Sequence, residues 1–400
     1  MPQRCGRQSI RLDVITLSDV TSASIGRCVA VAIVTAMMGA WSSKAFSRPA
    51  CLKLVSGGVS ADAVQLLARG VNLAGWMDGP NSPAPKTSVL IALRRIGLTH
   101  IRLPVPAELV MNRFTPDRDI EAQLGLVART LTTLNSLGFA VSIDLHPGDD
   151  FRKLHRDDPA AALNAAKDAW QKLAMIIRPF SPKRVYAELL NEPDVTAEIW
   201  QSHVIELAAL VRRLLPETLL IVGPVNWQRA DSLPQFVPLD DLNVMYAIHV
   251  YDPMVFTHQG HWDLTDPLHS IRGLPYPVSA ADPKVRFIRR QLATSSASAL
   301  RDLDAAIAET EKGDLLKTSL EPAVKWQQQY RRPLIVNEFG VLKAEAPPES
   351  RARWIGAVVE NAERNCWGWA HWELQQGFGL VDAKTDKIDS HVIDALMRKP

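Results

Sequence analysis

Two glutamates stand where short apolar runs of this chain give way to turns. Glu192 lies between Asn191 and Pro193, and Glu338 follows Asn337. A carboxylate at the end of a buried strand costs free energy unless it is hydrogen-bonded or has chemistry to perform. Cleavage of a glycosidic bond calls for such a pair, because one carboxylic acid protonates the leaving oxygen and a second carboxylate acts from the other side. Either motif alone is typical of a turn or a helix cap, so the prediction depends on the residues around them.

The elements that would position these glutamates alternate between strand-like and helix-like segments. Apolar runs predicted to be strands lie at 68–74, 100–103, 139–145, 184–190, 218–222, 243–249, 333–336 and 367–372. Helical patterns lie at 88–96, 120–137, 159–177, 198–215, 321–331, 350–364 and 388–397. Strands that are apolar throughout, rather than at every second residue, are typical of a parallel sheet covered on both faces.

This alternation predicts a (β/α)8 TIM barrel that forms a single domain over residues 46–400. A doubly wound sheet is the alternative, but no Gly-x-Gly-x-x-Gly motif follows the first predicted strand. No internal repeat or linker divides the chain. The stretch 251–295, rich in proline, histidine and tryptophan, is predicted to be an irregular insertion over the catalytic face.

Polar and aromatic residues recur at the C-terminal ends of the predicted strands, where barrel enzymes assemble their active sites. The set comprises Arg102, His146, Asn191, Glu192, His249, Tyr251, Glu338 and Trp372. Each of these residue types also occurs in purely structural positions, but their joint placement at successive strand ends favours an active site.

Further residues near these strand ends are assigned less directly. Trp76, Trp227 and Trp262 could extend the cleft by offering flat apolar faces to sugar rings, or could pack the barrel rim. Asp144 and Glu373 are predicted to point away from the cleft, because strand side chains alternate between two faces.

The overall composition excludes some classes of partner. The chain has 400 residues, of which 47% are hydrophobic, and its net charge is +2 without long runs of one sign. This lacks the basic footprint of a nucleic-acid-binding protein and favours an uncharged or weakly charged ligand. No cofactor and no metal is expected. His258 and His261 lack a third nearby ligand and helical spacing, so a polar loop is predicted there rather than a zinc site.

The first 45 residues have the pattern of an export signal. Arginines precede an uncharged apolar run at 28–41, and Ser43 and Ala45 offer the small residues of a cleavage site. The run is shorter than the roughly 20 apolar residues that span a bilayer. We expect a secreted or periplasmic protein without a stable membrane partner. An uncleaved anchor is the alternative, because this segment also contains Asp13 and Asp19.

Cleavage after Ala45 would leave Cys51 and Cys366 as the cysteines of the mature chain. Export would permit a disulfide bond between them, but two cysteines also occur as ordinary buried residues. Their spacing alone does not decide between these alternatives.

The chain resembles glycoside hydrolase family 5, the cellulase-like barrels with two catalytic glutamates, over nearly all of its length after residue 45. The matching segments are 68–76, 101–105 and 144–146 at the first three strands, and 190–193, 249–251, 337–340 and Trp372 at later ones. The segments 147–150 and 252–260 depart from the family pattern and could reshape the binding subsites.

This resemblance implies a retaining mechanism with Glu338 as the nucleophile and Glu192 as the acid/base. Glu192 is then expected to have a raised pKa, owing to partial burial and the charge of Glu338. Arg102 and Tyr251 are expected to keep Glu338 ionised, and Asn191 to bind the sugar 2-hydroxyl. His146 and His249 would bind hydroxyls and tune the two carboxylates, and Trp372 would support a sugar ring.

The leading hypothesis is an endo-β-1,4-glucanase, or cellulase, acting on polysaccharide or oligosaccharide. The same mechanism could act on β-mannan, mixed-linkage glucan or a bacterial exopolysaccharide, because loop geometry decides the substrate. A non-catalytic carbohydrate-binding barrel is the alternative of another class, and the presence of both Glu192 and Glu338 argues against it. A metal-dependent hydrolase that uses His258 and His261 would lose activity in chelator, which we do not expect.

Overall fold

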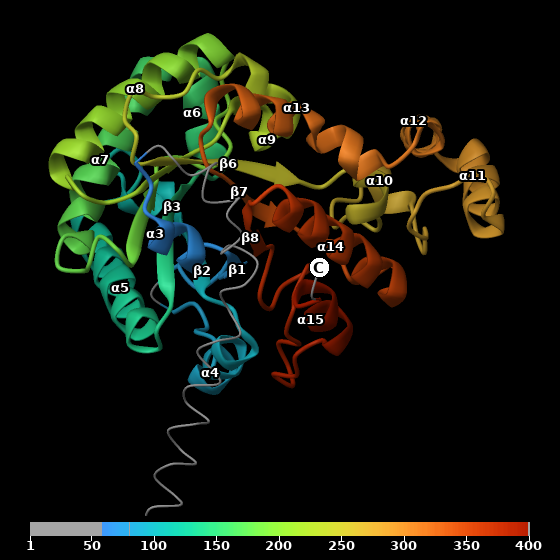
Figure 1. Cartoon of the computed structure of the whole chain (residues 1–400), viewed down its shortest axis with the longest axis horizontal. Coiled ribbons are helices and arrows are strands. Elements are labelled where there is room, and N and C mark those ends of the chain that lie inside the picture. The colour runs from blue at the N-terminus through green and yellow to red at the C-terminus, as the bar shows by residue number, and fades with distance from the viewer. Residues whose placement is uncertain (1–57, 80, 399–400) are drawn as a thin grey trace, which may run out of the picture. The chain divides into compact units, whose positions relative to one another are not determined.

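The computed structural model describes residues 58–79 and 81–398. Eight parallel strands close into a barrel in chain order, and β8 pairs with β1 through Arg69 and Trp369 (Figure 1). The strands are β1 Arg69–Asn72, β2 His100–Pro106, β3 Ala140–His146, β4 Val185–Glu188, β5 Leu220–Val222, β6 Val244–Val250, β7 Leu334–Phe339 and β8 Gly368–His371. The predicted (β/α)8 barrel is confirmed.

The strands form where the sequence is apolar throughout because both of their faces are covered. Every residue of β6 is buried, as is every residue of β7. Side chains that point outward meet the helices, and those that point inward fill the barrel. This explains why the sequence shows apolar runs instead of the alternation of a sheet with one face in water.

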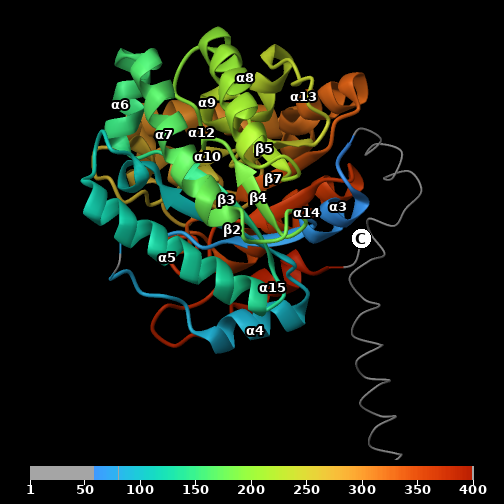
Figure 2. The same ribbon diagram turned by 90° about the vertical axis from the view of Figure 1, so that its left-hand side faces the viewer.

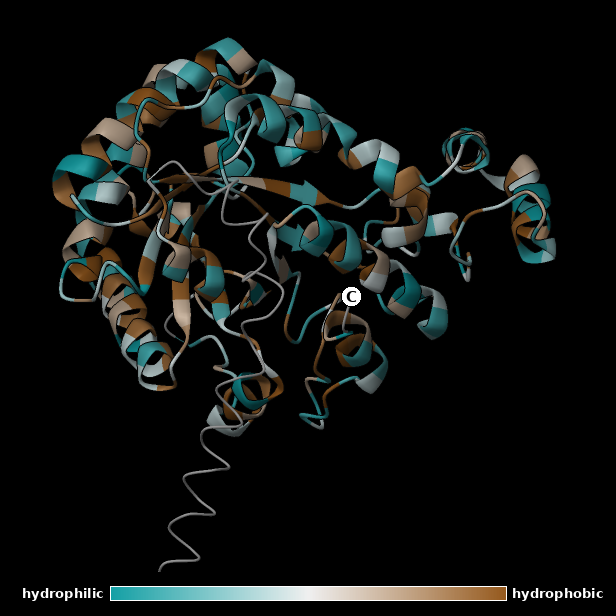
Figure 3. Cartoon of the chain, viewed as in Figure 1, coloured by the Kyte–Doolittle hydropathy of each residue, from teal (hydrophilic) through white to brown (hydrophobic). Residues whose placement is uncertain are grey.

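Helices cover the outside of the barrel. They are α3 Ala61–Leu66, α4 Thr87–Ile96, α5 Asp117–Ser136, α7 Pro159–Ile177, α8 Ala197–Leu214, α13 Leu315–Tyr330, α14 Pro348–Arg364 and α15 Ser390–Leu396. Figure 2 shows α5, α7 and α8 on one side of the barrel. Apolar and polar residues mix along each helix in Figure 3, as expected of helices with one face on a core.

Local signals set several of the helix ends. Asp158 caps α7, accepting a hydrogen bond from the Ala161 N–H, and Pro159 occupies its first turn. Gly97 ends α4 with φ 118°, a left-handed conformation that glycine adopts at little cost. These residues explain why the predicted bounds of α4 and α7 lie so close to the observed ones.

The stretch 251–295 is more helical than predicted. It contains α10 Met254–Thr257, the 3-10 helix η3 Pro267–Ser270 and α11 Pro283–Ser295, and α12 Ala297–Lys312 follows it. The prediction of an irregular segment was wrong, because α11 is highly polar on average and buries only Val285, Ile288 and Leu292. In Figure 1, α10, α11 and α12 lie beyond the C-terminal ends of β6 and β7.

Short helices also follow three of the other strands. The 3-10 helix η1 Ala107–Val110 follows β2, α6 Asp149–Asp157 follows β3, and α9 Val225–Gln228 with η2 Ala230–Gln235 follows β5. None of these four was predicted. They lie in the loops at the C-terminal ends of the strands, where sequence patterns are shortest.

Some predictions lie outside the described residues. These are the export signal over residues 1–45, its apolar run and the pairing of Cys51. Cys366 is disulfide-bonded. Within residues 58–79 and 81–398, no helix is long and apolar enough to cross a membrane.

Candidate active site

The barrel brings the predicted strand-end residues together around one buried cation. Arg102 on β2 is fully buried, and its Nη1 lies 2.6 Å from Oε1 of Glu338 on β7. Tyr251, which follows β6, donates from its hydroxyl to the other carboxylate oxygen of Glu338 at 3.0 Å. Both oxygens of Glu338 therefore accept a hydrogen bond, which fixes the orientation of the carboxylate.

Arg102 is held in turn by acidic residues that the sequence interpretation did not assign. Its Nε and Nη2 donate to the two carboxylate oxygens of Glu188 at 2.7 and 2.8 Å, in a bidentate pair. Its Nη2 also lies 2.9 Å from Oδ2 of Asp144 and donates to Oδ1 of Asn191 at 2.8 Å. Glu188 stands inside a predicted apolar strand. A charged residue in such a strand needs a buried partner, so its position in the sequence could have indicated that it belongs to a buried ion pair.

The prediction that Asp144 points away from the cleft was wrong. Asp144 and His146 are two residues apart on β3, so their side chains lie on the same face of the strand. Oδ2 of Asp144 lies 2.7 Å from Nδ1 of His146. Glu373, in contrast, accepts hydrogen bonds from the backbone N–H groups of Gln375, Gln376 and Phe378, and so shapes the loop after β8.

Burial and neighbouring charges shift the ionisation of this cluster. Burial would lower the pKa of Arg102, but Asp144, Glu188 and Glu338 raise it well above its usual value. Burial, the nearby Glu338 charge and the hydrogen bond to Glu338 raise the pKa of Tyr251 well above its usual value. Arg102 therefore stays a cation and Tyr251 stays a hydrogen-bond donor over the whole neutral range.

Glu192 lies just beyond β4 with φ 42°, an uncommon conformation for a residue with a side chain. Its Oε1 lies 3.0 Å from Nδ1 of His249, and its Oε2 accepts from Nη2 of Arg152 at 3.1 Å. Its backbone N–H donates to Oε1 of Gln228 at 2.8 Å. The sequence interpretation missed both Arg152 and Gln228.

The expected rise in the pKa of Glu192 is contradicted. Burial does raise it, but the hydrogen bond and charge of His249, the charge of Arg152 and that of His146 outweigh burial and lower it. The largest cause of the lowering is the hydrogen bond and charge of His249, and the charge of Arg152 on α6, a residue that the sequence analysis did not assign to the site, adds to it. In this structure Glu192 is a carboxylate at neutral pH.

The two carboxylates face one another across His249. One oxygen of Glu192, one oxygen of Glu338 and a ring nitrogen of His249 all lie within 4.8 Å of one another. This is the one group of its kind among the described residues that could hold a metal ion. Arg102 and Arg152 already supply positive charge to the two carboxylates, so a catalytic pair accounts for the arrangement more fully.

His146 and Trp372 form a flat, half-buried surface beside this pair. Their rings are stacked, with centroids 5.8 Å apart and planes at 13°. Burial would lower the pKa of His146, but the charge and hydrogen bond of Asp144 raise it. An indole with a hydrogen-bonding imidazole at its side suits a sugar ring, which has apolar C–H faces and polar edges.

The outlying tryptophans occupy different environments. Trp227 and Trp262 are 64% and 69% exposed, so both could contact a long ligand. Trp76 is buried and lines a cavity of about 490 Å³ with Gln375 and Gln376, between the loops that follow β1 and β8.

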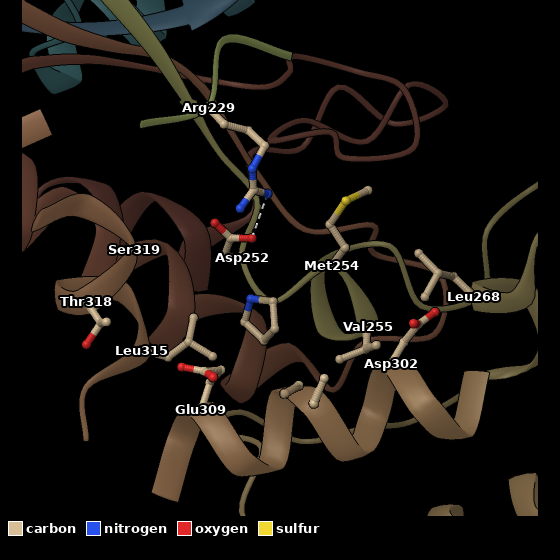
Figure 4. Close-up of a pocket in the computed structure, with 13 residues that line it drawn as sticks. Arg229, Asp252, Met254, Val255, Leu268, Asp302, Glu309, Leu315, Thr318 and Ser319 are labelled. Atoms are coloured by element: carbon tan, nitrogen blue, oxygen red, sulfur yellow. Dashed lines mark hydrogen bonds and ion pairs between the residues drawn. The ribbon is translucent and has the colours of Figure 1, made fainter. Parts of the chain in front are cut away.

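A second cavity, of about 530 Å³, lies between α10, α12 and α13. Figure 4 shows the ion pair of Arg229 with Asp252 on one side of it and Asp302 and Glu309 on α12. None of the predicted site residues lines this cavity.

The loop that carries His258 and His261 packs against the site as part of its wall. The His258 ring lies 5.1 Å from that of Tyr251 and 5.3 Å from that of Phe378. Burial, with the charge of His261, lowers the pKa of His258 to about 4. The expectation of a merely polar loop was incomplete, because His258 supports the ring of Tyr251.

A model of the family described as Cellulase (glycosyl hydrolase family 5) matches residues 59–376. Endoglucanase 3 of Fibrobacter succinogenes is 25% identical over 342 residues, which cover 80% of this chain and 51% of that protein. Endoglucanase C of Acetivibrio thermocellus is 24% identical over 348 residues, covering 82% of this chain and 98% of that protein. The chain thus spans about half of the first relative and nearly all of the second.

Solved structures share the fold. Cellulose synthase subunit Z of Clostridioides difficile superposes with a TM-score of 0.66 at 22% identity, covering 83% of this chain and 99% of that one. Cel5A of Thermotoga maritima, in complex with mannotriose, superposes with a TM-score of 0.66 at 22% identity. The match covers 84% of this chain and 99% of that one. The family model spans most of the chain and the curated relatives are endoglucanases, so this protein belongs to glycosyl hydrolase family 5 and is a glycosidase that hydrolyses O-glycosyl bonds.

Proposed function

We propose that the protein is an exported endo-β-1,4-glucanase that cleaves its polysaccharide with retention of configuration. The observation that carries this proposal is the pair Glu192 and Glu338, with an oxygen of each within 4.8 Å. Retaining glycosidases place their carboxyl groups about 5–5.5 Å apart, whereas inverting ones leave about 6.5–9.5 Å for a water molecule. The short separation supports direct attack by one carboxylate.

Glu338 is the nucleophile in this proposal. Its carboxylate attacks the anomeric carbon, the bond from that carbon to the leaving oxygen breaks, and a covalent glycosyl-enzyme forms. The contacts of Arg102 and Tyr251 with its two oxygens support this role, because they hold the carboxylate in one orientation. Both donors are fixed by the barrel and need no rearrangement during the reaction.

Glu192 is the acid/base. It gives a proton to the leaving oxygen in the first step, and in the second it takes a proton from the water that releases the sugar. Its place across His249 from Glu338 supports this division, since the leaving oxygen lies on the side away from the nucleophile. The contact with Gln228 fixes its backbone in the uncommon conformation described above.

The remaining residues would bind the sugar on which the reaction occurs. Asn191 is held by Arg102 through its amide oxygen, which leaves its amide nitrogen to donate to the 2-hydroxyl. Trp372 and His146 would support the ring and bind its hydroxyls. Trp227 and Trp262 would contact more distant sugars, which suits action within a long chain.

A β-1,4-glucan is proposed because the relatives described above are named endoglucanases. A second candidate is β-mannan, because the Thermotoga maritima structure was solved with mannotriose. Export is proposed from the apolar run at 28–41 and the small residues after it. Sequencing the N-terminus of protein recovered from a bacterial periplasm or medium tests export, and a chain that retains Met1 would contradict cleavage.

The test of the activity compares soluble β-1,4-glucan, mixed-linkage glucan and β-mannan as substrates. We expect release of reducing ends, fastest from β-1,4-glucan, with the product first seen by proton NMR as the β-anomer. A first product in the α-configuration would contradict retention. Binding of these glycans without any release would instead support the non-catalytic carbohydrate-binding barrel.

A further inference from the structure

We infer that Arg152 is a positioning residue that acts through Glu192, pairing with its side chain and main chain before the leaving sugar binds and withdrawing when it does. This inference rests on the acid/base role proposed for Glu192. It adds a residue outside the predicted set, which lies on α6 just after the segment 147–150.

The contact between Arg152 and Glu192 is specific. Nη2 of Arg152 donates to Oε2 of Glu192 at 3.1 Å, and Nη1 donates to the backbone oxygen of the same residue at 3.4 Å. The two side chains are 22% and 15% exposed, so the pair lies at the edge of the cleft. One guanidinium thus binds both the side chain and the main chain of the acid/base.

The helix that carries Arg152 is fixed at both of its ends. Glu108 accepts hydrogen bonds from the N–H groups of Gly148 and Phe151 at the start of α6. One turn beyond Arg152, Arg156 forms an ion pair with Asp194 in the loop after β4. Residues four apart share a helix face, so α6 presents two cations to the segment that carries Glu192.

These contacts give each oxygen of Glu192 a partner, and the cation on Oε2 disfavours the proton that an acid must deliver. Its Oε1 faces Nδ1 of His249 and its Oε2 faces Arg152. His249 is buried on β6 and cannot retreat, whereas Arg152 is partly exposed on a long side chain. Oε2 is therefore the oxygen that can receive the leaving group, after Arg152 has moved aside.

Other titratable groups surround the carboxylate of Glu192. Their effects on its ionisation must be separated from the effect of Arg152. They are His146 on β3, His249 and Tyr251 at β6, His258 in the following loop, and Glu338 on β7. All of them come from the barrel or its loops; His249 and Glu338 are more buried than Arg152, whereas His146 is about as exposed. Removing Arg152 changes the charge next to Glu192 without disturbing this inner set.

The two chemical steps place opposite demands on Arg152. In the first, the proton on Glu192 passes to the leaving oxygen as that oxygen separates from the anomeric carbon, and Arg152 opposes protonation. In the second, water gives its proton to Glu192 as the water oxygen bonds to the anomeric carbon and the bond from that carbon to Glu338 breaks, so Glu192 must be ionised beforehand. Arg152 thus favours the base step and is displaced for the acid step.

The experiment uses the full chain and the variants Arg152→Gln, Arg152→Lys and Arg156→Gln. The carbon-13 carboxyl signal of Glu192, assigned from its loss in Glu192→Gln, is followed through a pH titration. We expect the titration midpoint of Glu192 to rise by about one pH unit in Arg152→Gln, as for loss of an opposite charge at a partly exposed site. Arg152→Lys should shift it less, and Arg156→Gln should leave it unchanged.

Kinetics supply the second measurement. A carboxylate with a higher pKa stays protonated to higher pH, so the basic limb of kcat/KM for a cello-oligosaccharide should move up by about the same amount in Arg152→Gln. A 2,4-dinitrophenyl cellobioside has a leaving group that needs no proton, so its cleavage in the first step should proceed at the rate of the parent enzyme.

Three results separate this inference from its alternatives. An unchanged Glu192 titration in Arg152→Gln would overturn it. Equal losses on both glycosides would also overturn it, because they would indicate that Arg152 only holds α6 in place. If the parent cleaves neither glycoside, the proposed function fails, and the titration still decides whether Arg152 sets the ionisation of Glu192.

Discussion

At the scale of residues, the site is organised by one buried cation and the carboxylates around it. Arg102 is charged at any physiological pH and contacts Glu338, Glu188 and Asp144. Burying a charge costs desolvation free energy. That free energy is offset only when ion pairs and hydrogen bonds reach the charged group from several directions. The proposed nucleophile is therefore one member of a buried network that satisfies the charge of Arg102.

Replacing Glu188 tests this network. Glu188→Ala should destabilise the protein by about 3 kcal/mol or more, because it leaves Arg102 buried with one fewer partner. Glu188→Gln should cost less, since the amide keeps the volume and one acceptor for Arg102. Urea unfolding followed by tryptophan fluorescence measures both. Equal midpoints for Glu188→Ala and the parent would contradict the role given to the bidentate pair.

Replacing Tyr251 tests the second donor to Glu338. Tyr251→Phe should lower kcat/KM by roughly 10- to 100-fold, the effect of one lost hydrogen bond to a charged group. Because burial raises the pKa of Tyr251 well above its usual value, its hydroxyl does not titrate with the enzyme. The basic limb of the pH profile should therefore keep its position in Tyr251→Phe, and a moved limb would show that Tyr251 had been ionising.

At the scale of elements, the site depends on turns in which the main chain comes unusually close to other atoms. Gly340 ends β7, and a Cβ there would lie 2.2 Å from the backbone oxygen of Trp372. Asn226, Trp227 and Gln228 have positive φ values of 58°, 54° and 53°, which turn the chain so that Gln228 reaches the backbone of Glu192. Such strained stretches concentrate at functional sites.

Two glycine substitutions compare a turn at the site with a helix far from it. Gly340→Ala should destabilise the protein and reduce kcat by more than tenfold, because the ends of β7 and β8 must separate to admit the methyl group. Gly125→Ala lies on α5, where a Cβ would meet only the flexible end of Arg129. It should stabilise the helix by about 0.5–1 kcal/mol. Thermal unfolding and activity assays are carried out on both variants. A Gly340→Ala variant that is more stable and more active than Gly125→Ala would contradict the close approach at Gly340.

Sequence patterns predicted the eight strands well because burial on both faces leaves a strong apolar signal. The same patterns failed to predict helices that are mostly polar or that are held in place by polar contacts. The helix α11 is largely polar, and α6 is a short helix held by Glu108 and Arg156 through contacts distant in sequence. The strand-end residues could be listed from their spacing, but Glu188 and Arg152 could not, because their roles depend on which strands become neighbours.

At the scale of the whole molecule, the mechanism proposed above uses only side chains of this chain. Metal chelation should leave activity unchanged, because Arg102 and Arg152 already supply positive charge to Glu338 and Glu192. The assay is glucan hydrolysis before and after dialysis against EDTA, with zinc or calcium added back. Loss of activity that either ion restores would show that Glu192, His249 and Glu338 hold a metal instead.

The central claim is that Glu338 is the nucleophile of a β-1,4-glucanase, and one assay tests it most directly. Release of reducing ends from soluble β-1,4-glucan is measured for the parent, for Glu338→Ala and for Glu349→Gln, an exposed glutamate on α14 that serves as the matched control. The parent and the control should release sugar at the same rate, and Glu338→Ala should be slower by at least about 1,000-fold. Undiminished release by Glu338→Ala would contradict the assignment of the nucleophile. No release by the parent would contradict the assignment of the substrate.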